Sequence, residues 1–249
     1  MKKLHYAELM KMVEAQRAET SFYQIHALNY QGVSYEGKRY SEDLASYILK
    51  YLAEGKLKEL LLEKSHMESE KEFEKGPIHE KSQTYNPKSK RNEEKIAKRL
   101  MEQETVKVSQ YEKDTKVVDY QVPVNRVWHS SEGKVDLVLA NGKETIIGEL
   151  KDEDSKESLL RAMIEIYTYK LKIESCPSAK KRFEDCYHHS TIQPAVLFFA
   201  DEASLPYRDY CGAMQGSMPK LGELAQKLGI LFFEIQPKAN GEVNPQSWT

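Results

Sequence analysis

Two apolar, β-branched segments joined by a turn dipeptide dominate the middle of this chain. They cover residues 135–140 and 145–150 and flank Asn141-Gly142. This dipeptide is typical of two-residue hairpin turns because both of its positions tolerate positive φ, and such a turn would pair Ala140 with Lys143. Both faces of the expected hairpin carry apolar side chains, which indicates a central position in a sheet that is covered on both sides.

Charged side chains gather at the open end of this hairpin. A two-residue turn would place Asp136 opposite Ile147 and diagonal to Glu149. Because residues two positions apart share a face of a strand, Asp136, Glu149 and Lys151 would project to the same side. Two carboxylates at that spacing can reach one hard divalent cation, with an ammonium beside them. The hairpin therefore predicts a metal site at one end of a buried sheet, where charges without partners would be costly.

This arrangement resembles a known signature. Asp136, a gap of twelve residues and then Glu149-Leu150-Lys151 are similar to the Asp…Glu-x-Lys signature of the PD-(D/E)XK nuclease superfamily, with Val135 where Pro is often written. The resemblance implies a restriction endonuclease-like α/β fold, in which a mixed central β-sheet is flanked by helices. It also implies Mg²⁺ or Mn²⁺ as cofactor, held by Asp136 and Glu149 with help from the Leu150 carbonyl. Lys151 would then orient or activate water for phosphodiester hydrolysis.

A predicted helix before the first strand supplies a further candidate ligand. It follows Asn92 and extends to about residue 104, with Ile96, Ala97, Leu100 and Met101 as its apolar stripe. Glu93 projects into the middle of that stripe, whereas Glu94 lies at its edge. The resemblance implies that an acidic residue of such a helix can join the metal site, so Glu93 fits this role better than Glu94. A favourable charge at the helix N-terminus explains Glu93 equally well.

The order of the remaining predicted elements agrees with the same fold. We expect further strands at residues 117–127, 194–200 and 230–235, and helices at residues 155–173 and 221–228. A crossover helix between the hairpin and the strand that follows would make those strands parallel and produce a mixed sheet.

The long helix after the hairpin is expected to begin with an apparent capping box of Asp154 and Glu157. Its predicted buried stripe is Leu160, Met163, Ile164, Tyr167 and Leu171. Many members of the superfamily place a Gln and a Tyr on this helix near the site. This helix contains no Gln, so Arg161, Glu165 and Tyr167 are the candidates for those places.

We divide the chain into a helical N-terminal unit at residues 1–64, a charged linker at 65–91 and a nuclease-like domain at 92–249. Ser41 is the expected cap of the second N-terminal helix. Aromatic residues lie between the two helices: Phe22, Tyr23, Tyr30, Tyr35 and Tyr40. They could stack on unpaired bases, but packing between the helices is the interpretation that we favour.

Composition limits the partners and the compartment. The 249 residues are 40% hydrophobic and can bury a full core, and they contain neither a run of eighteen apolar residues nor a signal-peptide pattern. We therefore expect no membrane contact. Three cysteines without a Cys-x-x-Cys pair favour a reducing, cytoplasmic location. The net charge of −2 means that nucleic acid would be held by local patches and by metal.

A set of zinc-ligand residue types lacks the paired spacing of a zinc site: Cys176, Cys186, His188, His189 and Cys211.

Two functions are left open by the sequence. The first is a metal-dependent nuclease that hydrolyses phosphodiester bonds in DNA, in a restriction, repair or defence role. The second is a catalytically inactive nuclease-fold module that binds or scaffolds within a nucleic-acid-processing assembly. A homodimer formed through the N-terminal helices would let two sites cut both strands. Metal binding that depends on Asp136 and Glu149 separates the two functions.

Overall fold

The computed structural model describes residues 3–63, 92–102, 115–124, 133–188, 190–235 and 243–244. The predicted linker at residues 65–91 lies outside them, as does His189. The division into a helical unit, a linker and a nuclease-like domain therefore stays a prediction.

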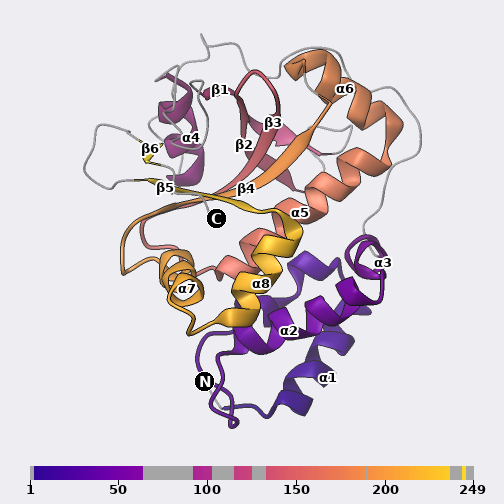
Figure 1. Ribbon diagram of the computed structural model, residues 1–249, viewed down its shortest axis with the longest axis vertical. Helices are drawn as coiled ribbons and strands as arrows, with labels where there is room; N and C mark the ends of the chain where they lie inside the picture. Colours follow the sequence, from indigo (N-terminus) through magenta and orange to yellow (C-terminus); the bar gives the residue numbers. More distant parts are fainter. Residues whose placement is uncertain are drawn as a thin grey trace.

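A mixed six-stranded sheet occupies the upper half of the molecule (Figure 1). Its strands lie in chain order: β1 (Lys116–Pro123), β2 (Lys134–Ala140), β3 (Thr145–Lys151), β4 (Ile192–Phe199), β5 (Leu231–Ile235) and β6 (Val243–Asn244). The first three strands are antiparallel, β4 and β5 run parallel to β3, and β6 is antiparallel to β5. The predicted α/β class with a mixed sheet is confirmed.

Helices connect the parallel strands, as parallel pairing requires. Between β3 and β4 lie α5 (Leu159–Ser175) and α6 (Pro177–Tyr187), and between β4 and β5 lie α7 (Leu205–Met214) and α8 (Pro219–Leu228). The sequence patterns predicted α5 and α8 but missed α6 and α7. In α6 only Ala179, Phe183 and Tyr187 are buried, so its periodic signal is weak. None of the described helices is long and apolar enough to cross a membrane.

The two faces of the sheet belong to two apolar cores. On one face, Val138 and Ile147 share a core with Met163 of α5. On the other face, Leu139 packs in a separate core with Leu100 of α4 (Asn92–Glu102). Alternation along each strand sends neighbouring side chains to opposite cores, so the hairpin is buried on both sides as predicted.

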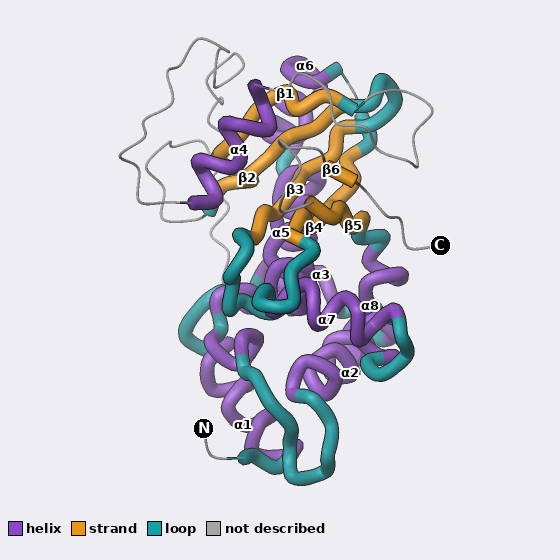
Figure 2. Tube along the Cα trace, turned by 90° about the vertical axis from the view of Figure 1, so that its left-hand side faces the viewer, coloured by secondary structure: helices purple, strands orange, loops and turns teal. Residues whose placement is uncertain are grey.

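The N-terminal residues form a helical region below the sheet (Figure 2). It consists of α1 (Tyr6–Arg17), η1 (Phe22–Gln24), η2 (His26–Asn29), α2 (Tyr40–Ala53) and α3 (Leu57–Leu62). Its apolar residues continue the core on the α5 side of the sheet, where Leu9 and Leu44 are fully buried. The expectation that Ser41 caps a helix is wrong, because α2 starts at Tyr40 after the N-cap Arg39. Arg39 is held by a bridge to Val33, and the helix begins directly after it.

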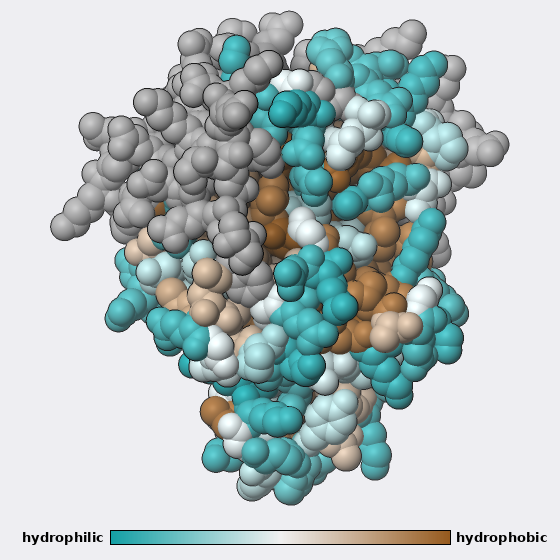
Figure 3. Space-filling model, viewed as in Figure 1, coloured by the Kyte–Doolittle hydropathy of each residue, from teal (hydrophilic) through white to brown (hydrophobic). Residues whose placement is uncertain are grey.

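The aromatic residues of this region mostly pack inside it. Phe22, Tyr23 and Tyr40 are buried, Tyr30 is half-buried and Tyr35 is 54% exposed. Figure 3 shows mainly hydrophilic side chains over the lower part of this view, where the N-terminal helices lie. The buried ring of Phe22 stacks on Tyr47 of α2, in agreement with packing inside the N-terminal region. The ring of Tyr23 instead meets Tyr169 of α5 edge-on, and Tyr35 stacks on His5 at the surface with 4.4 Å between ring centroids.

The turn between β2 and β3 is longer than the sequence predicted. Ala140 pairs with Thr145, so residues 141–144 form a four-residue loop. Asn141 Oδ1 accepts hydrogen bonds from the backbone N–H groups of residues 143 and 144, both at 2.9 Å, and this Asx-type turn replaces the tight hairpin. The pairing shifts by two residues, which keeps every side chain on its predicted face. The same register, extended by one pair, places Asp136 opposite Glu149 and not diagonal to it.

Candidate active site

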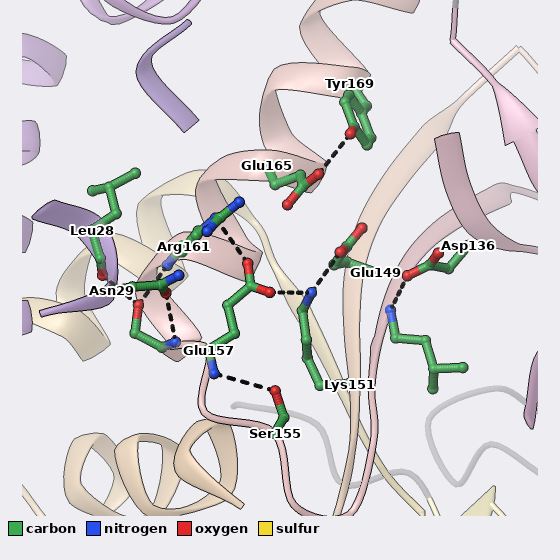
Figure 4. A network of polar contacts seen from close by, with 12 residues as sticks. Leu28, Asn29, Asp136, Glu149, Lys151, Ser155, Glu157, Arg161, Glu165 and Tyr169 are labelled. Carbon is green, nitrogen blue, oxygen red and sulfur yellow. Dashed lines mark hydrogen bonds and ion pairs between the residues drawn. The ribbon is translucent and has the colours of Figure 1, made fainter. Parts of the chain in front are cut away.

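The three motif residues lie together at one end of β2 and β3 (Figure 4). Asp136 Oδ2 accepts a hydrogen bond from the backbone N–H of Leu150 at 2.9 Å. Lys151 Nζ donates to Glu149 Oε1 at 2.8 Å. The exposed fractions of Asp136, Glu149 and Lys151 are 8%, 5% and 3%. The predicted same-side arrangement is thus present, and it is largely shielded from solvent.

Gln121 of β1 belongs to this cluster and was not singled out from the sequence. Its Nε2 donates to Asp136 Oδ1 at 2.7 Å, so both carboxylate oxygens of Asp136 accept hydrogen bonds. Gln121 has φ of +51°, which is uncommon for a residue with a side chain and is often found at functional sites. A positive φ at a polar strand position leaves no pattern in a single sequence, so this residue could not be predicted.

The residues before α5 bind Lys151 from the other side. Lys151 Nζ lies 3.0 Å from Glu157 Oε2, and Glu157 Oε1 lies 2.9 Å from Arg161 Nε. The predicted capping box of Asp154 and Glu157 is wrong, because the N-cap is Ser158, whose side chain accepts from the Arg161 N–H. Glu157 faces the charged cluster where it can pair with two cations, and this tertiary contact overrides the local pattern (Figure 4).

Glu165 and Tyr169 extend the cluster along α5. Glu165 Oε1 accepts a hydrogen bond from the Tyr169 hydroxyl at 2.7 Å (Figure 4). Of the three candidates for the Gln and Tyr places, Glu165 faces the motif residues and Arg161 pairs with Glu157. Tyr167 is only half-buried, and Tyr169 is the fully buried tyrosine of this helix. The spacing of four residues between Glu165 and Tyr169 was the signal that could have identified the pair.

Burial and mutual repulsion raise the pKa values of the carboxyl groups in the cluster. Burial raises the pKa of Asp136 to about 7, with Lys151 opposing the shift and Glu93 and Glu165 adding to it. Burial, followed by the charges of Asp136 and Glu165, raises the pKa of Glu149 well above its ordinary value. Negative charges that repel one another in a low-dielectric environment favour uptake of a cation. The cluster is therefore electrostatically suited to a positive ligand.

The Lys151 amine is held in its charged form. Burial alone would lower its pKa, but the nearby carboxylates of Glu149 and Glu157 outweigh burial and raise the pKa well above the ordinary value. Lys151 is therefore an ammonium group between two carboxylates, and it can donate hydrogen bonds or stabilise negative charge.

Glu93 of α4 lies close enough to the cluster to interact with it. Burial raises the pKa of Glu93, Lys151 lowers it and Asp152 raises it further. Glu94 instead forms an ion pair with Lys98, with 3.0 Å between the charged atoms. The electrostatic interaction of Glu93 with Lys151 agrees with the choice of Glu93 over Glu94, and the role of Glu93 as a metal ligand stays a prediction.

No preassembled metal cage is present in the part of the chain that the structure describes. Within it, no three His, Cys, Asp or Glu side chains lie close enough together to hold a metal ion. Glu149 is paired with Lys151, and Asp136 accepts two hydrogen bonds. The donor types nevertheless fit a hard divalent cation, because two carboxylates with raised pKa values face each other across neighbouring strands. Cys176, Cys186 and Cys211 are half-buried free thiols.

Comparison with known proteins gives little further information. No protein-family model matches the chain, and no curated protein matches it. Among solved structures, SfsA of Pyrococcus furiosus, determined in complex with Ca²⁺, is similar with 14% sequence identity and a TM-score of 0.27. The match covers 53% of this chain and 53% of SfsA, so the chain spans about half the length of that protein. A likeness this weak carries no argument about function.

Proposed function

We propose that the protein is a metal-dependent nuclease that hydrolyses phosphodiester bonds in DNA. The observation that carries this proposal is the meeting of Asp136, Glu149 and Lys151 at the end of a hairpin that is buried between two apolar cores. A folded core gains nothing from several buried carboxylates with raised pKa values, since burying charge is costly. Such a cluster is expected where chemistry requires it.

Asp136 and Glu149 are the residues that would hold Mg²⁺ or Mn²⁺, with Glu93 as the further candidate ligand. A divalent cation held there would polarise the scissile phosphate and lower the pKa of bound water. Gln121 and the Leu150 N–H fix the Asp136 carboxylate by hydrogen bonds, so its orientation is set before substrate binds. This preorganisation is the contribution that the protein makes to positioning the reacting groups.

Lys151 has a narrower role than the sequence resemblance implies. A general base must accept a proton, and an amine whose pKa is raised above its ordinary value is a poor acceptor at neutral pH. We assign Lys151 the tasks of orienting the attacking water by hydrogen bonding and of stabilising negative charge that develops on the phosphate. The ion pair between Lys151 and Glu149 must weaken when Glu149 binds the metal ion.

A non-catalytic binding or scaffolding module is the second candidate. The observation in its favour is that Lys151 is 3% exposed and already paired with Glu149 and Glu157. Calorimetric titration with Mn²⁺ separates the two functions. A nuclease should bind Mn²⁺, and Asp136→Asn and Glu149→Gln should each weaken that binding at least about tenfold. Absence of binding, or binding that neither substitution changes, would favour the scaffold.

A further inference from the structure

The segment between β3 and α5 is held in place by the N-terminal region. We call residues 152–158 the connector. The backbone N–H of Ser158 donates to Asn29 Oδ1 at 3.0 Å, and the Ser158 hydroxyl donates to the carbonyl of Leu28 at 2.5 Å. Gln31 Nε2 donates to the carbonyl of Lys156 at 3.0 Å. Three hydrogen bonds from residues 28–31 therefore fix the end of the connector, over a sequence separation of 125 to 130 residues.

Ser158 links the N-terminal region to the start of α5 by hydrogen bonds. Its Oγ also accepts a hydrogen bond from the Arg161 N–H at 3.1 Å, so one hydroxyl joins the N-terminal region to the first turn of the helix. Ser158 is 1% exposed, and water cannot readily replace these contacts. Figure 4 shows Leu28 and Asn29 on one side of this junction and Glu157 on the other.

Glu157 is the connector residue that reaches the candidate active site. It directly precedes Ser158, and its own N–H donates to Ser155 Oγ at 3.3 Å. Its carboxylate is 3.0 Å from Lys151 Nζ and 2.9 Å from Arg161 Nε. The backbone on both sides of Glu157 is therefore fixed, and the carboxylate is aimed at Lys151 (Figure 4).

We propose that Asn29 is a positioning residue for Lys151, acting through Ser158 and Glu157. The N-terminal helical region thereby becomes a structural part of the active site. The positioning role is supported by these contacts whether or not the protein cleaves nucleic acid, whereas its effect on cleavage rests on the proposed nuclease function. Weakening the Asn29–Ser158 contact should displace Glu157, so that the Lys151 ammonium keeps only its ion pair with Glu149 and becomes more mobile, although no motif residue is substituted.

The direct test observes the Lys151 ammonium itself, in the full-length chain. A ¹H–¹⁵N spectrum of side-chain ammonium groups should contain a slowly exchanging signal that is absent from Lys151→Arg, which keeps the positive charge but has no ammonium group. Asn29→Ala should broaden or shift this signal, and Asn29→Asp, which keeps an oxygen acceptor for the Ser158 N–H, should retain it. If Asn29→Ala does not fold, Ser158→Ala removes the bonds to Leu28 and Arg161 and should have the same effect. An unchanged signal in the folded variant would overturn the proposal.

Glu42→Ala is the matched control. Glu42 also joins the N-terminal region to the rest of the chain, because its carboxylate accepts from the N–H groups of Lys220 and Leu221 at 2.6 and 3.0 Å. This junction lies at α8 and not at the connector. Loss of stability alone would affect Glu42→Ala and Asn29→Ala alike, so only a specific positioning role changes the Lys151 signal in Asn29→Ala and leaves it unchanged in Glu42→Ala.

Cleavage kinetics separate this proposal from the proposed function. Misplacement of a group that acts in the transition state should lower kcat about tenfold to a hundredfold in Asn29→Ala and leave KM within about twofold. A changed ammonium signal with no wild-type cleavage would support the positioning role and contradict the nuclease. Wild-type cleavage with an unchanged signal and unchanged kcat in Asn29→Ala would support the nuclease and contradict the positioning role.

Discussion

The Glu157 carboxylate lies 3.0 Å from the Lys151 ammonium and joins the start of α5 to the end of β3. Glu149 contacts the same ammonium at 2.8 Å. Lys151 is therefore a buried cation between two carboxylates that come from different elements. Loss of this cation should lower the free energy of unfolding, because Glu149 pairs with it alone among the ion pairs of the described residues and Glu157 shares its charge between Lys151 and Arg161.

Lys151→Met should destabilise the protein strongly. The substitution keeps an unbranched side chain but leaves the carboxylates of Glu149 and Glu157 without the ammonium. Removing one partner of a buried ion pair costs about 3–5 kcal/mol. Urea unfolding at neutral pH measures the loss, and Lys151→Arg, which keeps the charge, should lose less. Equal stability of Lys151→Met and the wild type would mean that these ion pairs do not form.

Gly133 should not tolerate a side chain. A Cβ at this position would lie 1.8 Å from the Tyr169 hydroxyl oxygen, and Gly133 has φ of +63°. Gly133→Ala should therefore displace Tyr169, break its bond to Glu165 and lower stability by about 2 kcal/mol or more. Thermal unfolding of Gly133→Ala, Tyr169→Phe and the double variant measures the energetic coupling between positions 133 and 169. Because Tyr169→Phe removes the closest atom, the two effects should be less than additive, and strict additivity would contradict the contact.

At position 121, a Gly variant should be more stable than an Ala variant, which is the reverse of the usual order in a strand. Both Gln121→Ala and Gln121→Gly lose the hydrogen bond to Asp136, but only Gly relieves the positive φ of +51°. Gln121→Gly should therefore be more stable than Gln121→Ala by about 1 kcal/mol. Both variants should cleave more slowly than the wild type, because Asp136 loses a fixed donor. Chemical denaturation ranks the two, and the ordinary order, with Ala more stable, would contradict the backbone conformation.

Asp209 should make stability depend on pH. Burial raises its pKa from 3.8 to about 6, although the Leu159 N–H and Arg39 oppose the shift. The folded state therefore binds this proton more tightly than the unfolded state, so stability is highest below pH 4 for this group and falls as pH rises through about 6. The full effect is about 3 kcal/mol.

Asp209→Asn isolates this contribution. The amide keeps an oxygen acceptor for the Leu159 N–H, which the wild-type carboxylate binds at 3.2 Å, and it does not titrate. The difference in unfolding free energy, wild type minus variant, should decrease between pH 4 and pH 7. A difference that stays constant over this range would contradict the raised pKa.

The sequence predicted the motif geometry despite an incorrect turn. The four-residue loop at residues 141–144 moved the pairing by two positions, and an even shift leaves Asp136 and Glu149 on the same face. A shift of one residue would have separated them. The mixed sheet followed from the hairpin and the two apolar strands after it, because a helical crossover makes those strands parallel.

The rest of the site depends on contacts that a single sequence does not encode locally. Glu157 looked like a capping residue because Asp154 stands three positions before it, but its partners are Lys151 and Arg161. Ser158 takes its partners from residues about 130 positions away. Neither contact has a periodic or compositional signature, so only the folded chain identifies them.

Cleavage of nucleic acid by the wild type and by Asp136→Asn is the most direct test of the central claim. Plasmid, single-stranded DNA and RNA are incubated with each purified protein in Mn²⁺, with and without a chelator, after both proteins are shown to be folded. We expect metal-dependent cleavage of DNA by the wild type and at least about a hundredfold slower cleavage by Asp136→Asn. Absence of cleavage in the wild type, or equal cleavage by the variant, would contradict the assignment of this cluster as a nuclease site.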